Sequence, residues 1–174
     1  SRTPVREALR QLELEGLVLM IPRKGAEVAE ITRKNMMDVL EVRKALEELA
    51  AELACERIGK EQIAEMRVAA KEFERTLKTG DVTQIAEADE KFHDILYIAT
   101  NNQRLILLLN NLREQMYRLR VEHLKLKECY PQLLAEHDII IDCVEKRNKE
   151  AAKDIVRRHI DYQAKSVGYV LEEK

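Results

Sequence analysis

The chain has 174 residues, of which 45% are hydrophobic and 36% are charged, and its formal net charge is −2. This balance is typical of a globular protein. The small negative charge excludes a global basic field, so any contact with nucleic acid must come from a local patch. Glycine (5) and proline (3) are scarce, which predicts long helices with few breaks.

The cysteine pattern indicates the compartment. Cys55, Cys129 and Cys143 are scattered, odd in number and contain no C-x-x-C motif. This favours a reducing compartment, so we expect a cytoplasmic protein. The longest apolar run, residues 105–109, is far too short to span a bilayer, and no membrane partner is expected.

Residues 1–16 are predicted to form a short helix. Thr3 is a suitable N-cap, Pro4 suits the first helical position, and Gly16 ends the helix. The apolar positions expected to be buried are Val5, Ala8, Leu9 and Leu12. Three arginines at intervals of four residues line one exposed edge, namely Arg2, Arg6 and Arg10.

A basic hairpin is predicted next. Residues 17–21 and 26–29 read as short strands on either side of Pro22, Arg23, Lys24 and Gly25. An arginine-edged helix followed by a basic hairpin is what a winged helix-turn-helix places in the grooves of DNA. The alternative interpretation is a solvated helix followed by an ordinary turn.

The amino-acid sequence of this segment favours the first interpretation. The sequence SRTPVREALR at residues 1–10, then Leu12, EGLV at residues 15–18 and PRKG at residues 22–25, closely resembles the recognition helix and wing of GntR-family bacterial transcription regulators. In that family two further helices precede the recognition helix. The resemblance therefore implies that residues 1–30 are a partial winged helix-turn-helix domain, which should not bind operator DNA well alone. It also implies a homodimer, with DNA contacts from Arg2, Thr3, Arg6, Arg10, Arg23, Lys24 and Gly25.

From residue 31 the composition changes to long helices. We expect a first helix capped at Thr32 or Asn35 and running to about residue 58. Further helices are expected at about 60–79, 81–102 and 103–127, with a fifth that begins at Pro131 and a sixth that begins near Asn148. Short connections between them predict an antiparallel bundle of six or seven helices in residues 31–174. The predicted fold class is therefore mainly α, a truncated winged helix-turn-helix followed by a helical bundle.

Polar residues on apolar helix faces are the main signal for a site. Asp89 and His93 share a face with Ile85, Phe92 and Leu96. They either satisfy each other or share a metal, because burying unpaired polar groups is costly. His137 and His159 lie on apolar stripes of later helices, so all four could converge on one first-row transition metal. Satisfied core histidines remain the alternative, and His123, which also lies on a stripe, shows that periodicity alone cannot decide.

Arg43 lies on the apolar stripe of the first long helix. A buried arginine is almost never unpaired. Either it forms an ion pair with a glutamate such as Glu47 or extends its head group to solvent, or it docks a ligand carboxylate. The pattern leaves these interpretations open.

The helical part is similar to the FCD effector domain of the FadR subfamily. The resemblance rests on a D-x-x-x-H pair on one helix and single histidines on two later helices. It implies one divalent metal per chain, most simply zinc, with nickel or manganese as alternatives, held by Asp89, His93, His137 and His159. It also implies a small carboxylate effector facing Arg43. The implied function is a ligand-responsive transcription regulator whose effector modulates binding to operator DNA.

Two competing hypotheses remain. A helical-bundle metalloenzyme is suggested by the E-x-x-H motif of Glu90 and His93, but di-iron sites need two such motifs, and Leu134 and Val156 stand three residues before the later histidines. A structural metal in an interaction bundle is the third hypothesis. It would require a closed coordination shell and no cavity at Arg43.

Overall fold

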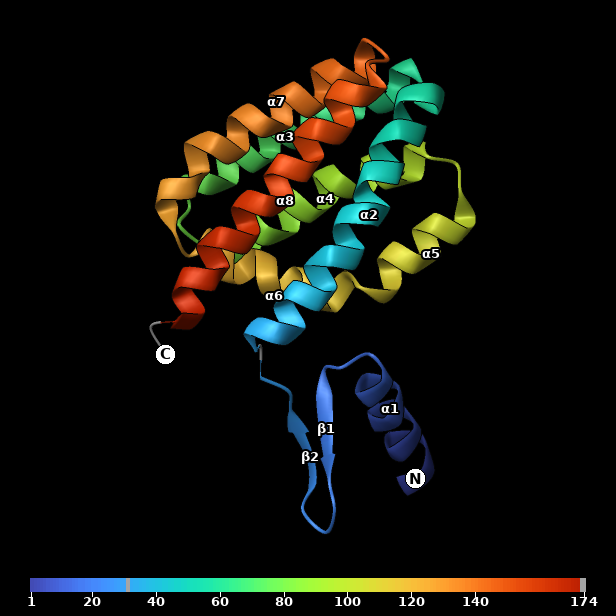
Figure 1. Cartoon of the computed structure of the whole chain (residues 1–174), viewed down its shortest axis with the longest axis vertical. Coiled ribbons are helices and arrows are strands. Elements are labelled where there is room, and N and C mark those ends of the chain that lie inside the picture. Colours follow the sequence, from blue (N-terminus) through green and yellow to red (C-terminus); the bar gives the residue numbers. More distant parts are fainter. Residues whose placement is uncertain (31, 173–174) are drawn as a thin grey trace.

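The structure is a computed structural model that describes residues 1–30 and 32–172, and side chains up to residue 168. A small head made of α1 (Arg2–Leu14), β1 (Val18–Ile21) and β2 (Gly25–Val28) hangs below a large helical bundle (Figure 1). The predicted fold class is confirmed. The predicted domain boundary at residue 31 lies outside the described residues.

Helix α1 differs from its prediction in two respects. Its N-cap is Ser1, whose hydroxyl accepts a hydrogen bond from the Thr3 amide at 3.4 Å, so the prediction of Thr3 as the cap is wrong. Ser is as good a cap as Thr, and Pro4 is tolerated within the first turn. The expected burial is also wrong, since α1 has no buried residue and Val5 is 59% exposed. The reason is that β1 is the main neighbour of α1 within the described residues.

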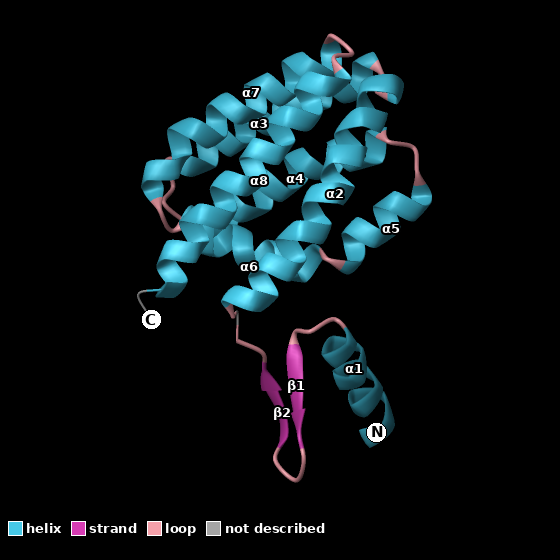
Figure 2. Ribbon diagram, in the orientation of Figure 1, coloured by secondary structure: helices cyan, strands magenta, loops and turns pink. Residues whose placement is uncertain are grey.

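The hairpin has the expected form. Strands β1 and β2 pair antiparallel, with Val18 opposite Val28 and Ile21 opposite Gly25 (Figure 2). The turn is closed by a hydrogen bond from the Lys24 amide to the Ile21 carbonyl at 3.0 Å. Gly25 has a φ of +106°, a conformation that only glycine adopts without strain.

Seven helices form the bundle in the described part of the chain. They are α2 (Arg33–Arg57), α3 (Lys60–Leu77), α4 (Val82–Ala99), α5 (Gln103–Asn111), α6 (Arg113–Leu124), α7 (Tyr130–Glu145) and α8 (Lys149–Glu172), with a short 3-10 turn, η1 (Lys127–Cys129), before α7. Side chains at the N-cap positions explain where α2 and α4 begin. Thr32 accepts from the Asn35 amide at 3.1 Å, and Asp81 accepts from the Thr83 amide at 2.9 Å.

One predicted helix is broken. The helix expected at 103–127 is divided into α5 and α6, which meet at Leu112, where φ is −97° and ψ is −3°. The two residues before Leu112 are asparagines, which favour turns over helix interiors. The new direction is fixed by Arg113, whose guanidinium binds Glu90 at 2.6 Å and Asp94 at 2.8 Å on α4.

The bundle core places the candidate site in its middle. Helix α2 packs along α8, and α3 packs along both α4 and α7 (Figure 1). Side chains of α4 and α7 meet in the interior, where Phe92 stacks on His137 with ring centroids 4.0 Å apart. The side chains of Phe73, Phe92 and Ile140 are fully buried around this space. No helix in the described residues combines the length and apolarity needed to cross a membrane.

Candidate functional site

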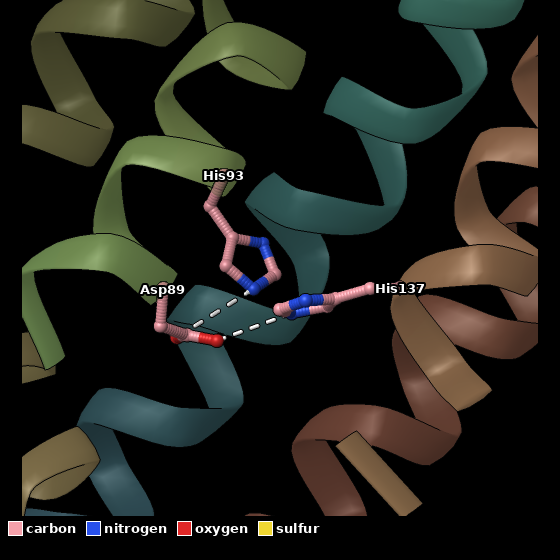
Figure 3. A group of neighbouring side chains, drawn as sticks. All are labelled: Asp89, His93 and His137. Atoms are coloured by element: carbon pink, nitrogen blue, oxygen red, sulfur yellow. Dashed lines mark ion pairs between the residues drawn. The ribbon is translucent and has the colours of Figure 1, made fainter. Parts of the chain in front are cut away.

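Three of the four predicted metal ligands converge. Asp89 and His93 project from α4 and His137 projects from α7, and the three side chains point toward one another (Figure 3). Their ligand atoms lie within 4.8 Å of one another, and all three side chains are buried. The one-turn spacing on α4 puts the carboxylate and the first imidazole on one face, and the neighbouring helix supplies the second imidazole.

The buried polar atoms of this cluster lack partners. Among the described residues, neither ring nitrogen of His93 or His137 has a hydrogen-bond partner, nor does Asp89 Oδ1. His137 Nε2 lies 3.1 Å from Asp89 Oδ1 and His93 Nε2 lies 3.9 Å from Asp89 Oδ2, without hydrogen-bond alignment. Five unpaired polar atoms in one buried cluster would be expensive. The residues therefore fit a bound cation, which would satisfy several of these atoms at once.

The electrostatics also suit a metal. Burial lowers the pKa of His93 well below its usual value, so its imidazole is neutral. Burial acts to raise the pKa of Asp89, but Arg120 and the neighbouring histidines outweigh it and hold that pKa well below its usual range. A neutral imidazole and an ionised carboxylate are the protonation states that metal ions require.

Arg120 is a site residue that sequence analysis missed. It extends from α6 into the interior, is 2% exposed, and its Nε donates to Asp89 Oδ2 at 2.5 Å. This bond holds the carboxylate so that Oδ1 faces His137, whose Nε2 lies 3.1 Å away. A buried arginine among polar neighbours on α6 gives no periodic signal, because polar residues surround this helix on nearly every face.

His159 stands beside the three converging residues with its nitrogens already engaged. Its ring centroid is 5.2 Å from that of His93, but Nδ1 bonds Glu136 Oε2 at 2.6 Å and Nε2 bonds Gln163 Nε2 at 2.9 Å. It is therefore not part of the group whose ligand atoms converge. A carboxylate on Nδ1 is the partner that commonly orients a metal-ligating histidine. Its role as the fourth ligand stays a prediction.

Arg43 forms the ion pair that was one of its predicted interpretations. Its Nε donates to Glu47 Oε1 at 2.5 Å, and its Nη1 donates to Gln163 Oε1 at 2.6 Å. The guanidinium is fully buried, and its Nη2 has no hydrogen-bond partner in the part of the chain that the structure describes. Pairing with Glu47 does not exclude the docking interpretation, because one donor of the fork is left over.

His123 is buried but stays outside the converging group. Its ring meets Tyr162 edge to face at 5.5 Å, and neither of its nitrogens has a hydrogen-bond partner among the residues described. Burial lowers the pKa of His123 to about 4, so it is neutral near pH 7. The structure assigns it no ligand role with Asp89.

A surface hollow leads toward the cluster. A pocket of about 360 Å³ between α3 and α7 has His137 in its lining, together with Lys71, Glu74 and Asp138. It gives the buried imidazole a connection to the surface. Glu90, the acidic residue of the E-x-x-H motif, instead binds Arg113 at 2.6 Å and contributes nothing to the cluster.

The predicted DNA-contacting residues are exposed on the head. Arg2, Thr3, Arg6 and Arg10 are exposed on α1, and Arg23, Lys24 and Gly25 form the exposed hairpin tip. The head is attached to the bundle through α6. Gln115 Nε2 donates to the Glu15 carbonyl, and Arg118 Nη2 donates to the Ala29 carbonyl at 2.6 Å.

Comparison with known proteins identifies the family. The FCD domain model matches residues 38–162. The chain is 32% identical over 174 residues to the HTH-type transcriptional regulator YdhC of Bacillus subtilis, covering 99% of this chain and 78% of that protein. It is 30% identical over 118 residues to the Nta operon transcriptional regulator of Aminobacter aminovorans, covering 67% of this chain and 55% of that protein.

A solved structure agrees with these relatives. The crystal structure of a GntR-family transcriptional regulator from Pseudomonas syringae pv. tomato superimposes with a TM-score of 0.64 at 28% identity, covering 99% of this chain and 71% of that one. These proteins are regulators of transcription and not enzymes, which removes the metalloenzyme hypothesis. The chain belongs to the GntR family of transcription regulators and carries an FCD domain.

Proposed function

We propose that this chain is a ligand-responsive regulator whose bundle, residues 31–174, binds a divalent metal and a small carboxylate effector that together modulate operator binding by a dimer. The observation that carries the proposal is the set of unpartnered atoms on Asp89, His93 and His137 within 4.8 Å of one another. Such a cluster is costly unless a cation occupies it.

The metal would be held by Asp89, His93 and His137, with His159 as a fourth ligand after its Nε2 leaves Gln163. Three imidazoles and a carboxylate suit zinc, and nickel or manganese are also compatible with this donor set. When bound, the metal supplies a positive centre with open positions for ligand oxygens. Glu136 orients His159, and Arg120 orients Asp89.

The effector class follows from Arg43. A guanidinium presents two parallel N–H groups that match a carboxylate, and the Nη2 of Arg43 is left without a partner among the described residues. Helix α2 places this group on the His93 side of the cluster, where Glu47 Oε2 lies 3.9 Å from His93 Nδ1. A small carboxylate could therefore contact both the guanidinium and the metal.

The coupling to DNA runs through the head. Residues 1–30 would supply the recognition helix and wing, with phosphate and base contacts from Arg2, Thr3, Arg6, Arg10, Arg23, Lys24 and Gly25. Helix α6 supports the coupling because it contacts both the proposed metal cluster and the head: Arg120 bonds Asp89, while Arg118 bonds Ala29. Dimerisation would align two heads with the two half-sites of an operator.

The proposal is tested by the metal content of the purified chain, measured by elemental analysis. We expect about one equivalent of a transition metal in the wild type and loss of that metal in Asp89→Ala and His137→Ala, because each removes a converging donor. His123→Ala is the matched control, a buried histidine outside the cluster, and should keep its metal. Metal-free wild type, or equal metal content in all variants, would refute the site.

The effector is tested separately. Mono-, di- and hydroxycarboxylates are titrated into the zinc-loaded chain, and binding is followed by calorimetry. Arg43→Met should abolish carboxylate binding while zinc content stays near one equivalent, since the guanidinium is not a metal ligand. Carboxylate binding that survives Arg43→Met would show that the effector docks elsewhere.

A further inference from the structure

The side chain of Gln163 connects the two groups that the proposed ligands need. Its Oε1 accepts from Arg43 Nη1 at 2.6 Å, and its Nε2 donates to His159 Nε2 at 2.9 Å. The side chain is 3% exposed, and it lies one turn after His159 on α8. A single carboxamide therefore spans the gap between the guanidinium and the imidazole.

The direction of these bonds is fixed by their neighbours. An arginine can only donate, so the oxygen of the Gln163 carboxamide faces Arg43. The amide nitrogen of Gln163 therefore faces Nε2 of His159 and donates to it, so Nε2 is the acceptor. The proton of this imidazole then lies on Nδ1, which donates to Glu136.

Each of these bonds uses an atom that a ligand would require. Nε2 of His159 has one lone pair, and a bond from Gln163 uses the pair that would otherwise ligate a metal. Nη1 of Arg43 is one half of the fork that grips a carboxylate in a bidentate manner, and Gln163 leaves only Nη2 unpartnered among the described residues. A carboxamide has nearly the shape of a carboxylate.

We propose that Gln163 is a built-in competitor, whose carboxamide holds the place of the effector carboxylate and must leave when His159 ligates the metal. This inference rests on the proposed function and adds the carboxylate subsite, between Arg43 and His159, and the residue that controls it. It also predicts that metal and effector bind cooperatively, because displacing one carboxamide frees both His159 and Arg43. Gln163 is a positioning residue and not a ligand.

The test is a double-mutant cycle read as zinc affinity. The Kd for Zn²⁺ is measured by competition with a chromogenic chelator in wild type, Gln163→Leu, His159→Ala and the double variant. Gln163→Leu should lower the Kd about tenfold in the wild-type background, which corresponds to about 1.4 kcal/mol, the size of one net hydrogen bond. In the His159→Ala background the same change should leave the Kd unaltered.

Controls separate competition from a loss of structure. Circular dichroism reports whether each variant folds, and Gln163→Ala replaces the leucine variant if that one does not. Gln132→Leu makes the same change at an exposed glutamine that bonds Glu136 Oε1 at 2.7 Å and is not bonded to Arg43 or His159. It should change the zinc Kd far less.

The outcomes distinguish this inference from the proposed function. If the wild type binds zinc and the Kd of Gln163→Leu is unchanged or higher, the competitor role of Gln163 is overturned while the metal site stands. If Gln163→Leu lowers the zinc Kd equally in the wild-type and His159→Ala backgrounds, competition for His159 is overturned. Failure of both wild type and Gln163→Leu to bind zinc would overturn the competitor together with the proposed function.

Discussion

Replacement of Arg120 by methionine tests how the buried carboxylate is compensated. Arg120 Nε donates to Asp89 Oδ2 at 2.5 Å, and both side chains are almost completely buried. Arg120→Met keeps an unbranched apolar stem but removes the charge. Removing one partner of a buried ion pair costs about 3–5 kcal/mol, because the other charge is left uncompensated. We expect this loss in the free energy of unfolding of the metal-free chain, a large share of the roughly 5–15 kcal/mol that holds a domain together.

A bound metal should reverse most of the loss. Zinc would supply Asp89 with a positive charge in place of the guanidinium, and the variant also loses a cation that repels the metal. The assay is urea unfolding followed by far-ultraviolet circular dichroism at pH 7, once with EDTA and once with saturating zinc. The deficit of Arg120→Met relative to wild type should be large in EDTA and clearly smaller in zinc.

Arg118→Met is the control for this experiment. It lies two residues away on α6, is half-buried, and donates its hydrogen bond to the Ala29 carbonyl. Its loss should cost about 1 kcal/mol, the net value of one hydrogen bond, and equally in EDTA and zinc. The reasoning would be refuted if Arg120→Met lost the same free energy of unfolding, relative to wild type, in EDTA and in zinc. It would also be refuted if Arg120→Met were as stable as wild type in EDTA.

Three further changes probe other parts of the structure. Burial acts to raise the pKa of Glu47, but an arginine one turn earlier lowers it from 4.5 to about 2, so the ionised form stabilises the fold above about pH 4.5 and this contribution is lost as the pH falls toward 2. Glu47→Gln should therefore remove part of the acid sensitivity seen in urea unfolding at pH 7 and pH 3. Phe92→Ala removes a fully buried ring and should lower the free energy of unfolding by about 3–5 kcal/mol in thermal melts. Gly16→Ala should accelerate proteolysis between head and bundle, because φ is +71° and the new Cβ would lie 3.2 Å from Gln115 Nε2, whereas Gly80→Ala, with the same φ and open space around it, should not.

Most of the fold could be predicted because its helices begin and end at local signals. Thr32 and Asp81 cap their helices as expected, and Gly16 and Gly80 follow helix ends with positive φ. The break at Leu112 could not be predicted, because leucines continue at helical spacing across it. The two asparagines before Leu112 are a weak local signal, and the direction that the chain takes after them is set by the ion pairs of Arg113 with α4, which no local pattern records.

The site was predictable to the extent that polar residues interrupt apolar stripes. Asp89, His93 and His137 interrupt such stripes, and the structure brings them together. The residues that control them gave no such signal. Arg120 lies on a helix that is polar on nearly every face, and Gln163 bonds Arg43 from 120 residues away along the sequence. Periodicity can show that a side chain is buried, but its partner is decided by how distant helices pack.

The contact between head and bundle has a consequence for regulation. Among the residues that the structure describes, α6 makes two hydrogen bonds to the head, through Gln115 and Arg118, and each is worth about 1 kcal/mol net. Coupling free energies between sites in regulated proteins are typically about 1–3 kcal/mol. A shift of α6 that breaks both bonds would therefore release an amount of the size that regulation uses. Arg120, on the same helix, donates to the carboxylate of Asp89, which would be a ligand of the metal. Because a helix moves nearly as a rigid unit, a shift of α6 that displaces Arg120 also strains both bonds to the head. A small difference in ligand affinity between two positions of α6 would then suffice to change how the head is held.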